Sequence, residues 1–409
     1  MAELKVEVDP AEAGFDADRL KRIDAHFDRY VGSGRLPGWL AVVSRQGRIV
    51  HAGRGGYRDV EAEAPVETDT LWRIFSMTKP ITSVAAMILA EEGLLELDDP
   101  ISRWLPEFAE PRVYVKGSAL KPLTEPATEP IRVWHLLTHT AGLTYGFHHG
   151  HPVDAMYRAA GFEWGTPPGL DLAACCAKWA SLPLVFQPGS EWNYSVATDV
   201  LGRVVEVVSG QPLDEFFAAR IFTPLGMADT GFVASSVSRL AALYVPDPAS
   251  GRAVRNDAFG RLGTSAPECL SGGGGLVSSA ADYWRFTEML LRGGELDGIR
   301  LLSPRTVALM TSNHLPGHVD LEEFGRPLFA EMPFDGHGFG LGFSVLEDPV
   351  KARTLSSPGE FAWGGAASTA FWVDPDEDLT VGFYTQLLPS STYRLRSQLR
   401  QLVYQALVD

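Results

Sequence analysis

The 409-residue chain is 45% hydrophobic and 21% charged, which is typical of a globular protein with one large domain or two ordinary ones. Its formal net charge of −16 repels nucleic acid and anionic membranes, and no apolar run approaches 18 residues, so neither partner is expected. Cys175, Cys176 and Cys269 match no zinc spacing and are odd in number, so we expect no metal, no disulfide framework and a reducing cytoplasm.

The first elements along the chain are a helix, a hairpin and a second helix. Apolar residues at spacings of three and four predict an amphipathic helix over residues 17–31. Two β-rich runs within residues 39–59, joined around Arg45-Gln46-Gly47, predict an antiparallel hairpin. Pro80 is tolerated only in a first helical turn, so the following apolar helix is expected to open at Ser76 and to end near residue 93.

The rest of the chain divides into a helical middle and a strand-rich end. Residues 98–265 carry helical patterns separated by Pro- and Gly-rich loops, with few strand signals. Strand patterns return after residue 266, before a C-terminal helix. We therefore predict an α/β fold in which residues 1–97 and 266–409 form an antiparallel sheet flanked by helices. Residues 98–265 form an inserted, mainly helical domain, with the active site at the interface.

The stretch "FSMTKP" at residues 75–80 places a serine and a lysine three positions apart at a helix start. Positions i and i+3 share one helix face, so Lys79 can reach Ser76 and act as the base that makes its hydroxyl a nucleophile. The helix N-terminus adds backbone N–H groups that suit an oxyanion. A lone S-x-x-K motif also occurs by chance, in which case Lys79 is an ordinary surface charge, so partners elsewhere in the chain decide its meaning.

Further segments supply such partners. Tyr194 stands in "PGSEWNYSVATDVLG", on a loop before an amphipathic helix, and could serve as a hydrogen-bond partner or a second base. Trp363-Gly364-Gly365 lies within a strand pattern, where glycines often mark the close approach of a ligand or another backbone. The stretch "HLLTHTAGLTYGF" ends a helix and enters a glycine-containing loop.

Together these motifs resemble the serine β-lactamase and penicillin-recognising family. The resemblance runs from the hairpin at Trp39 to the C-terminal helix and is closest to the class C-like, or family VIII, carboxylesterases. It implies that Ser76 is the acylated nucleophile, that Lys79 is the base or proton shuttle, and that Tyr194 assists proton transfer. It also implies that the backbone N–H groups of Ser76 and Ala366 form the oxyanion hole.

The chain departs from the family pattern at two positions. Val196 replaces the asparagine of the Tyr-x-Asn element, and Trp363 replaces the lysine of the Lys-Thr-Gly element that would pair with a substrate carboxylate. The resemblance implies a substrate pocket that includes Trp363, Gly364 and Gly365, with Tyr145 at its border. Neutral, apolar acyl or alcohol groups are favoured there.

The leading hypothesis is therefore a serine carboxylesterase, of the EC 3.1.1 type, that acts on short- to medium-chain acyl esters through a Ser76 acyl-enzyme and needs no cofactor. The alternatives are an acyltransferase, a β-lactamase, a D-amino-acid peptidase, and a penicillin-fold sensor with little turnover. Whether Lys79 or Tyr194 takes the serine proton stays open. The small-molecule ester, its stereochemistry and the oligomeric state are not given by the sequence.

Other conspicuous residues have simpler interpretations. His148, His149 and His151 resemble a metal cluster, but their spacing matches no standard zinc signature. His139 is interpreted as a structural histidine. Residues 272–275, four glycines without a following Lys-Ser/Thr, indicate tight packing near the sheet rather than a phosphate loop. Cys175 and Cys176 are expected in the core, and Glu163 and Glu191, the nearest acids that could assist a water, as solvated loop charges.

Overall fold

The computed structural model describes residues 4–326 and 333–408, and its centre is an eight-stranded antiparallel sheet. The predicted sheet built from both ends of the chain is confirmed, because its strands come from residues 38–65 and 337–384. In spatial order the strands are β12 (His337–Phe339), β13 (Ser344–Leu346), β14 (Phe361–Gly364), β15 (Ala370–Asp374), β16 (Leu379–Tyr384), β1 (Gly38–Arg45), β2 (Arg48–Asp59) and β3 (Ala64–Pro65).

The predicted hairpin is β1 and β2, and its turn sits where the sequence placed it. Gln46 and Gly47 both have positive φ angles, 54° and 71°. A two-residue turn with φ above zero at both positions matches the right-handed twist of the flanking strands. β1 pairs with β2 on one side and with β16 on the other, so the first strand of the chain lies in the middle of the sheet.

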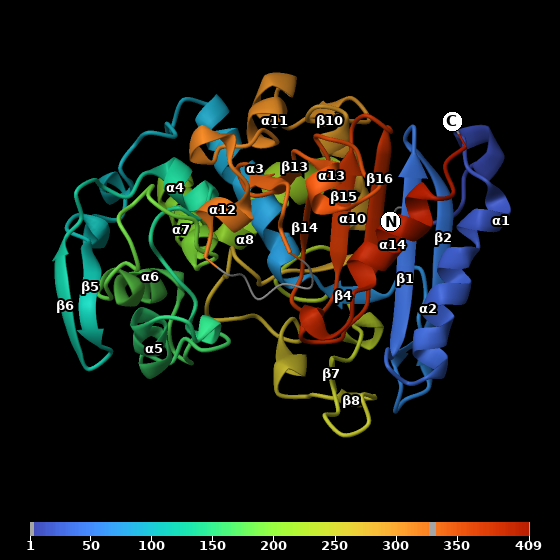
Figure 1. Ribbon diagram of the computed structural model, residues 1–409, viewed down its shortest axis with the longest axis horizontal. Helices are drawn as coiled ribbons and strands as arrows, with labels where there is room; N and C mark the ends of the chain where they lie inside the picture. The colour runs from blue at the N-terminus through green and yellow to red at the C-terminus, as the bar shows by residue number, and fades with distance from the viewer. Residues whose placement is uncertain (1–3, 327–332, 409) are drawn as a thin grey trace.

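Two layers of helices cover the sheet (Figure 1). One face carries α1 (Ala17–Leu20), α2 (Arg22–Gly32) and α14 (Leu395–Tyr404), and the other carries α3 (Thr78–Glu91) and α10 (Ala280–Leu291). Successive side chains of a strand point to opposite faces. Accordingly Trp39, Ala41 and Val43 of β1 join the core under α2 and α14, whereas Leu40 and Val42 join the core around α3.

The predicted N-terminal helix is broken in two. A turn at Lys21 separates α1 from α2, and α1 is capped by the carboxylate of Asp16 on the backbone N–H groups of Asp18 and Arg19. The apolar spacing is nevertheless as expected, because Leu20, Ile23 and Phe27 are fully buried.

Residues between the two sheet-forming segments are mainly helical, although the domain boundaries stay a prediction. The helices here and in the C-terminal part are α4 (Val133–Leu137), α5 (Pro152–Ala159), α6 (Leu172–Ala180), α7 (Ala197–Ser209), α8 (Leu213–Phe217), α9 (Thr223–Leu225), α11 (Pro304–Met310), α12 (Leu321–Phe324) and α13 (Pro349–Ala352). Cys175 and Cys176 of α6 are fully buried, which confirms core packing.

Small sheets that the sequence did not predict accompany these helices. They pair β5 (Arg112–Ser118) with β6 (Lys121–Pro126), β7 (Tyr244–Pro246) with β8 (Ala253–Arg255), β4 (Leu71–Arg73) with β9 (Val277–Ser279), and β10 (Glu295–Leu296) with β11 (Ile299–Arg300). The first pair projects from the helical side of the molecule (Figure 1).

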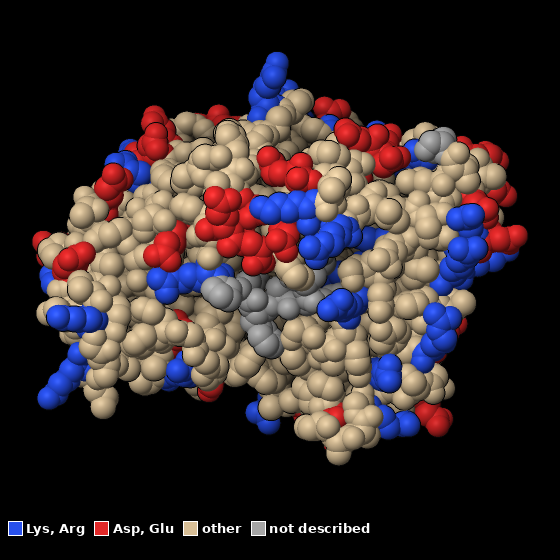
Figure 2. All heavy atoms as spheres, viewed as in Figure 1, with Lys and Arg blue, Asp and Glu red and all other residues tan. Residues whose placement is uncertain are grey.

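The helix α3 joins the helical part to the sheet. Every residue from Thr78 to Leu89 is buried, because α3 packs against α7 on one side and shares a core with β1 on another. Over the described residues, the longest helices are too short or too polar to cross a membrane. Figure 2 shows acidic and basic side chains alternating over one face of the molecule.

Candidate active site

The serine of the S-x-x-K motif lies on a strained turn at the start of α3. Ser76 is in the single 3₁₀ turn η2 (Phe75–Met77), which runs directly into α3 rather than being the first residue of the α-helix itself. Phe75 has a φ of 44°, in the left-handed region that a bulky residue rarely adopts. Such strain persists only where neighbouring structure fixes it, and it often occurs at functional sites.

Lys79 is buried beneath the serine and is surrounded by oxygen atoms. Its Nζ lies 3.2 Å from Oγ of Ser76, 3.1 Å from the hydroxyl of Tyr145 and 2.7 Å from the carbonyl oxygen of Gly273. Three acceptors match the three protons of an ammonium. Once one proton is lost, Tyr145 and Gly273 can accept the remaining two N–H bonds, which leaves the nitrogen lone pair for the hydroxyl proton of Ser76.

Asp199 positions Gly273, whose carbonyl contacts Lys79, and the sequence interpretation missed this residue. Its carboxylate accepts hydrogen bonds from Oγ of Ser271, at 2.5 Å, and from the backbone N–H of Gly273, at 3.0 Å. Burial raises the pKa of Asp199 above its ordinary value, against the opposing effect of the positive charge of Lys79. The available signal was an acid on the first turn of the helix that follows Tyr194.

The glycines at 272–275 allow this close packing. A side chain at Gly272 would meet Thr82 of α3 and the carbonyl of Thr198, and one at Gly273 would lie 2.4 Å from the Asp199 carboxylate. Tight packing was predicted, but the partners are α3 and α7 rather than the sheet. The physical reason is that this loop fills the gap between the two helices directly under Lys79.

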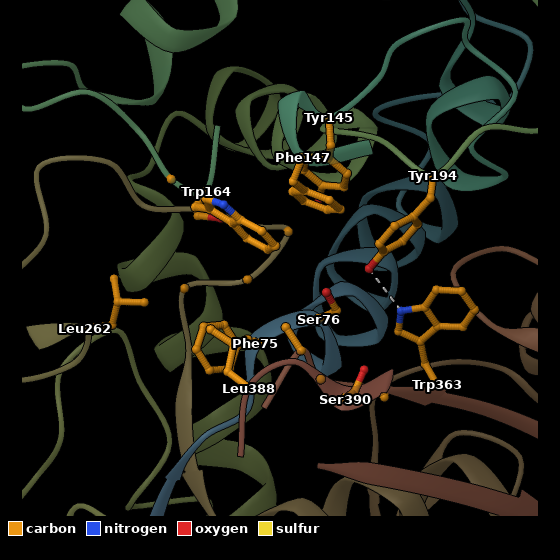
Figure 3. Close-up of a pocket in the computed structure, with 18 of the residues that line it drawn as sticks. Phe75, Ser76, Tyr145, Phe147, Trp164, Tyr194, Leu262, Trp363, Leu388 and Ser390 are labelled. Atoms are coloured by element: carbon orange, nitrogen blue, oxygen red, sulfur yellow. Dashed lines mark hydrogen bonds between the residues drawn. The ribbon is translucent and has the colours of Figure 1, made fainter. Parts of the chain in front are cut away.

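Two tyrosines approach Lys79 in different ways. The ring of Tyr194 lies 4.5 Å from Nζ, a cation–π distance, and its hydroxyl accepts a hydrogen bond of 3.2 Å from Nε1 of Trp363 (Figure 3). Tyr145 instead places its hydroxyl on Nζ, while its ring is partly open to the pocket. Burial of that hydroxyl, with a smaller effect of Asp199, raises the pKa of Tyr145 well above its ordinary value.

Histidines fix the loop that carries Tyr194. Nε2 of His148 donates a hydrogen bond of 2.6 Å to the carbonyl of Tyr194. The ring of His139 lies 4.9 Å from the Tyr194 ring, and its Nδ1 is 3.2 Å from Oγ of Ser195. Burial lowers the pKa of both histidines, so each stays neutral at pH 7. His139 thus supports the site from behind, as a structural histidine would.

The Trp-Gly-Gly-Ala segment ends β14 and turns toward β15 beside the serine. A side chain at Gly365 would lie 2.4 Å from the carbonyl of Ile74, just before the serine turn, and one at Gly364 would meet the guanidinium of Arg396. The predicted close approach of another backbone is confirmed at Gly365, whereas Gly364 faces a side chain. Ala366 lines the same pocket as Ser76, and its oxyanion-hole role stays a prediction.

These residues surround a cavity of about 600 Å³. Ser76 lies at its base, with Tyr145, Phe147 and Trp164 on one side and Tyr194 and Trp363 on the other (Figure 3). Every residue predicted for the site lines this cavity except Lys79, which sits behind Ser76. Most of the remaining wall is apolar, with aromatic rings as its largest side chains.

The other candidate residues lie at the margin. Among the described residues, no group of three or more His, Cys, Asp and Glu side chains could hold a metal ion. His149 lies 3.7 Å from Glu163 on the surface, and His151 caps α5 through its ring nitrogen. Glu163 is exposed, as expected of a loop charge, whereas Glu191 is half-buried and pairs with Arg326 at 2.9 Å.

Comparisons with known proteins give a consistent result. A family model described as Beta-lactamase matches residues 23–405. The chain is 42% identical over 365 residues to Protein Rv1367c of Mycobacterium tuberculosis, covering 87% of each. It is 35% identical over 420 residues to Esterase EstB of Burkholderia gladioli, covering 97% of this chain and 98% of the relative. The solved structure of EstCE1, "a hydrolase with promiscuous acyltransferase activity", superposes with a TM-score of 0.80 at 32% identity, over 95% of this chain and 98% of that one.

Proposed function

The chain belongs to the β-lactamase family, as its sequence motifs predicted, and from this premise we propose that it is a serine carboxylesterase for short- to medium-chain acyl esters. The matches to an esterase and to a hydrolase with acyltransferase activity support a serine esterase or acyltransferase of this fold. The observation that carries the finer proposal is the 3.2 Å contact between Lys79 and Ser76 at the base of an apolar cavity.

The reaction proceeds in two half-reactions. Lys79 or Tyr194 takes the hydroxyl proton as Oγ of Ser76 forms a bond to the ester carbonyl carbon, and the oxyanion lies between the N–H groups of Ser76 and Ala366. One such donor contributes about 3–4 kcal/mol to the transition state. Tyr194 returns a proton to the departing alcohol, and water then attacks the acyl-enzyme by the reverse proton route.

The indole at position 363 favours esters over β-lactams. Trp363 stands where the resemblance places a lysine, and its indole N–H is directed to Tyr194 rather than to a substrate carboxylate. A neutral indole offers no ion pair to the carboxylate of a penicillin. Its buried ring instead favours contact with apolar groups, such as those of a neutral acyl ester.

Acyl transfer to a second alcohol is a distinct candidate activity. EstCE1, which the chain resembles along nearly its whole length, is described as having it. The aromatic walls of the cavity would hold an apolar alcohol close to the acyl-enzyme, where the alcohol competes with water. A rise in the ratio of transfer to hydrolysis when 1-butanol is supplied would establish this activity, and an unchanged ratio would exclude it.

Replacement of Ser76 tests the proposal. We expect the wild-type protein to hydrolyse p-nitrophenyl butyrate and to show a butyryl adduct on Ser76 by mass spectrometry. Ser76→Ala should lose both, whereas Ser118→Ala, on the exposed β5–β6 hairpin, should keep both. Retained activity in Ser76→Ala would refute the nucleophile. A stable adduct without steady-state turnover would indicate a sensor, and faster hydrolysis of nitrocefin than of esters would indicate a β-lactamase.

A further inference from the structure

Three aromatic rings stack in sequence from the catalytic centre to the mouth of the cavity. Tyr145 and Phe147 lie with ring centroids 4.7 Å apart and planes 20° from parallel, and Phe147 and Trp164 with centroids 5.1 Å apart and planes 13° from parallel. The hydroxyl of Tyr145 contacts Lys79, so the inner end of the stack is fixed at the reacting residues. Figure 3 shows the stack on the side of Ser76 opposite Trp363.

The two loops that carry these rings are locked together. The segment η5 (Gly146–His148) lies directly on the chain at Phe162, so that a side chain at Gly146 would be 2.2 Å from the Phe162 carbonyl. Arg158 of α5 donates a hydrogen bond to the carbonyl of Gly146. The backbone segments that carry Phe147 and Trp164 are therefore held side by side.

The outer end of the stack is open. Trp164 is 48% exposed, whereas each of the other nine tryptophans is buried or half-buried. Phe259, from a separate loop, makes a T-shaped contact with Trp164, with ring centroids 6.2 Å apart and planes at 80°, and Leu262, which follows on the same loop, is 47% exposed. An exposed cluster of large apolar side chains at a cavity mouth indicates a binding site.

We propose that Tyr145, Phe147 and Trp164 form a subsite, the aromatic stack subsite, for a planar aromatic ring of the ester substrate. This inference rests on the serine-esterase function proposed above and narrows its substrate class to aryl-bearing esters. The ring is carried either on the alcohol or on the acyl side of the carbonyl, since the same wall can receive both.

The chemistry of the wall favours a flat ring over a branched alkyl chain. Offset stacking of aromatic rings is favourable beyond the burial of area alone, because the negative face of one ring meets the positive edge of another. Trp164, the outermost ring of the stack, can therefore receive one more planar group in the same offset-stacked arrangement. A bulky aliphatic group gains the burial of its surface but not the stacking contribution.

The first test is kinetic. Trp164→Ala should raise KM about tenfold for an ester bearing a naphthyl group, the size of effect that one stacking contact produces, and less than twofold for ethyl butyrate. Two ring-bearing esters distinguish the side: 2-naphthyl butyrate carries the ring in the alcohol, and ethyl 3-(2-naphthyl)propanoate carries it in the acyl group. Trp164→Phe should restore KM to within about threefold of wild type.

Trp104→Ala is the matched control, because Trp104 is a half-buried indole next to Arg103 and does not line the cavity. It should leave every KM unchanged. If Trp164→Ala raises KM for one naphthyl ester alone, the ring binds from that side of the carbonyl. If it raises KM for both esters, the subsite accepts the ring from either side. If Trp164→Ala changes neither, or raises KM for ethyl butyrate equally, the aromatic stack subsite is refuted.

The second test is independent of turnover. In a Ser76→Ala background, N-(2-naphthyl)butanamide, which is not hydrolysed, should bind by calorimetry about tenfold more weakly after Trp164→Ala and unchanged after Trp104→Ala. If no ester is turned over but this difference is seen, the proposed function fails and the subsite stands. N-ethyl-3-(2-naphthyl)propanamide is the matching probe with its ring on the acyl side. Equal affinities in all three proteins for both amides overturn the subsite whatever the kinetics show.

Discussion

Lys79 is the residue whose surroundings decide the chemistry. Its amine contacts Ser76, Tyr145 and Gly273, and the ring of Tyr194 covers it. Every neighbour is an oxygen or a ring face, so the nitrogen can hold a proton or pass it on without moving. The two phenols have different partners, and each therefore has a separate role that substitution can reveal.

Loss of the lysine amine should abolish proton transfer from the serine. We expect Lys79→Ala to lower kcat for p-nitrophenyl butyrate by at least about a hundredfold, the usual contribution of a general base. Lys178→Ala, which changes an exposed lysine on α6, is the control and should keep the wild-type rate. A near-normal kcat for Lys79→Ala at neutral pH would contradict the assignment of Lys79 as base.

Removal of the Tyr194 hydroxyl should matter most for poor leaving groups. Ethoxide must receive a proton as it departs, whereas p-nitrophenolate leaves without one, so Tyr194→Phe should lower kcat/KM for ethyl butyrate by a factor about ten larger than for p-nitrophenyl butyrate. Tyr145→Phe removes a contact of Lys79 instead and should slow both esters equally. Equal losses in Tyr194→Phe would exclude Tyr194 as the proton donor.

At this scale the sequence predicted that Ser76 and Lys79 lie together, but not which residues surround them. Ser76 and Lys79 are neighbours in the chain, so helical periodicity alone places them together. The contact of Asp199 with Gly273 and Ser271 depends on a loop more than 70 residues later, which no local pattern reports. The hydroxyl contact of Tyr145 with Lys79 is likewise tertiary, and the sequence indicated only that Tyr145 borders the pocket.

At the scale of an element, the short helix α4 begins with a hydrogen bond to a buried histidine ring. The backbone N–H of Arg132 donates a hydrogen bond of 2.9 Å to Nδ1 of His135, which must be neutral to accept it. Burial, with a smaller effect of the Arg132 charge, lowers the pKa of His135 to about 4 from an ordinary value of 6.5. The helix therefore depends on an unprotonated imidazole.

This arrangement predicts a loss of stability in mild acid. Between pH 6.5 and 4 the unfolded chain binds a proton at His135 that the folded chain does not, so the free energy of unfolding falls as the pH falls through this range. At pH 5 the loss from this one group is about 2 kcal/mol. Urea unfolding at pH 7 and pH 5 measures it. His135→Asn, which keeps an acceptor but does not titrate, should show a smaller difference in the free energy of unfolding between the two pH values. An unchanged difference would show that His135 is not the cause.

Three of the strands that sequence patterns missed share one property, whereas the missed pair β4 and β9 is buried but only three residues long in each strand. β5 and β6 are exposed along most of their length, and β8 is largely exposed too, so their side chains show no alternation of apolar and polar residues. The strands of the main sheet were predicted because burial makes them apolar: β1, β15 and β16 are buried at every position. Sequence patterns detect burial, and strands held mainly by backbone hydrogen bonds leave little trace.

At the scale of the whole molecule, the two ends of the chain are joined through α14. Arg400 of α14 pairs with Glu360, just before β14, where both side chains are buried, and its guanidinium lies 5.0 Å from the centre of the Trp372 ring of β15. The same helix contacts α1 and α2 from the N-terminal segment. The last helix thus holds β14, the strand that carries Trp363, against the remainder of the sheet.

The buried ion pair makes a large difference to stability once one partner is lost. Arg400→Met leaves the Glu360 carboxylate without its cation in the core, and we expect the free energy of unfolding to fall by about 3–5 kcal/mol. The double variant Glu360→Gln/Arg400→Met should regain most of this, because no charge then remains buried. Arg19→Met, at an exposed pair with Asp16, should cost less than about 1 kcal/mol. Urea unfolding of the three variants measures these differences. A double variant no more stable than Arg400→Met would contradict the assignment of the loss to the unpaired carboxylate of Glu360.

The placement of β1 between β2 and β16 has a consequence for synthesis of the protein on the ribosome. Ser76 and Lys79 emerge early, yet the strand that closes β1 and the turn that carries Ala366 are translated near the end. Until then the nascent chain exposes an unpaired edge of β1, which can pair with neighbouring chains. The turn that carries Ala366 can therefore reach Ser76 only after β15 and β16 have been translated, and until then the open edge of β1 is exposed to mispairing.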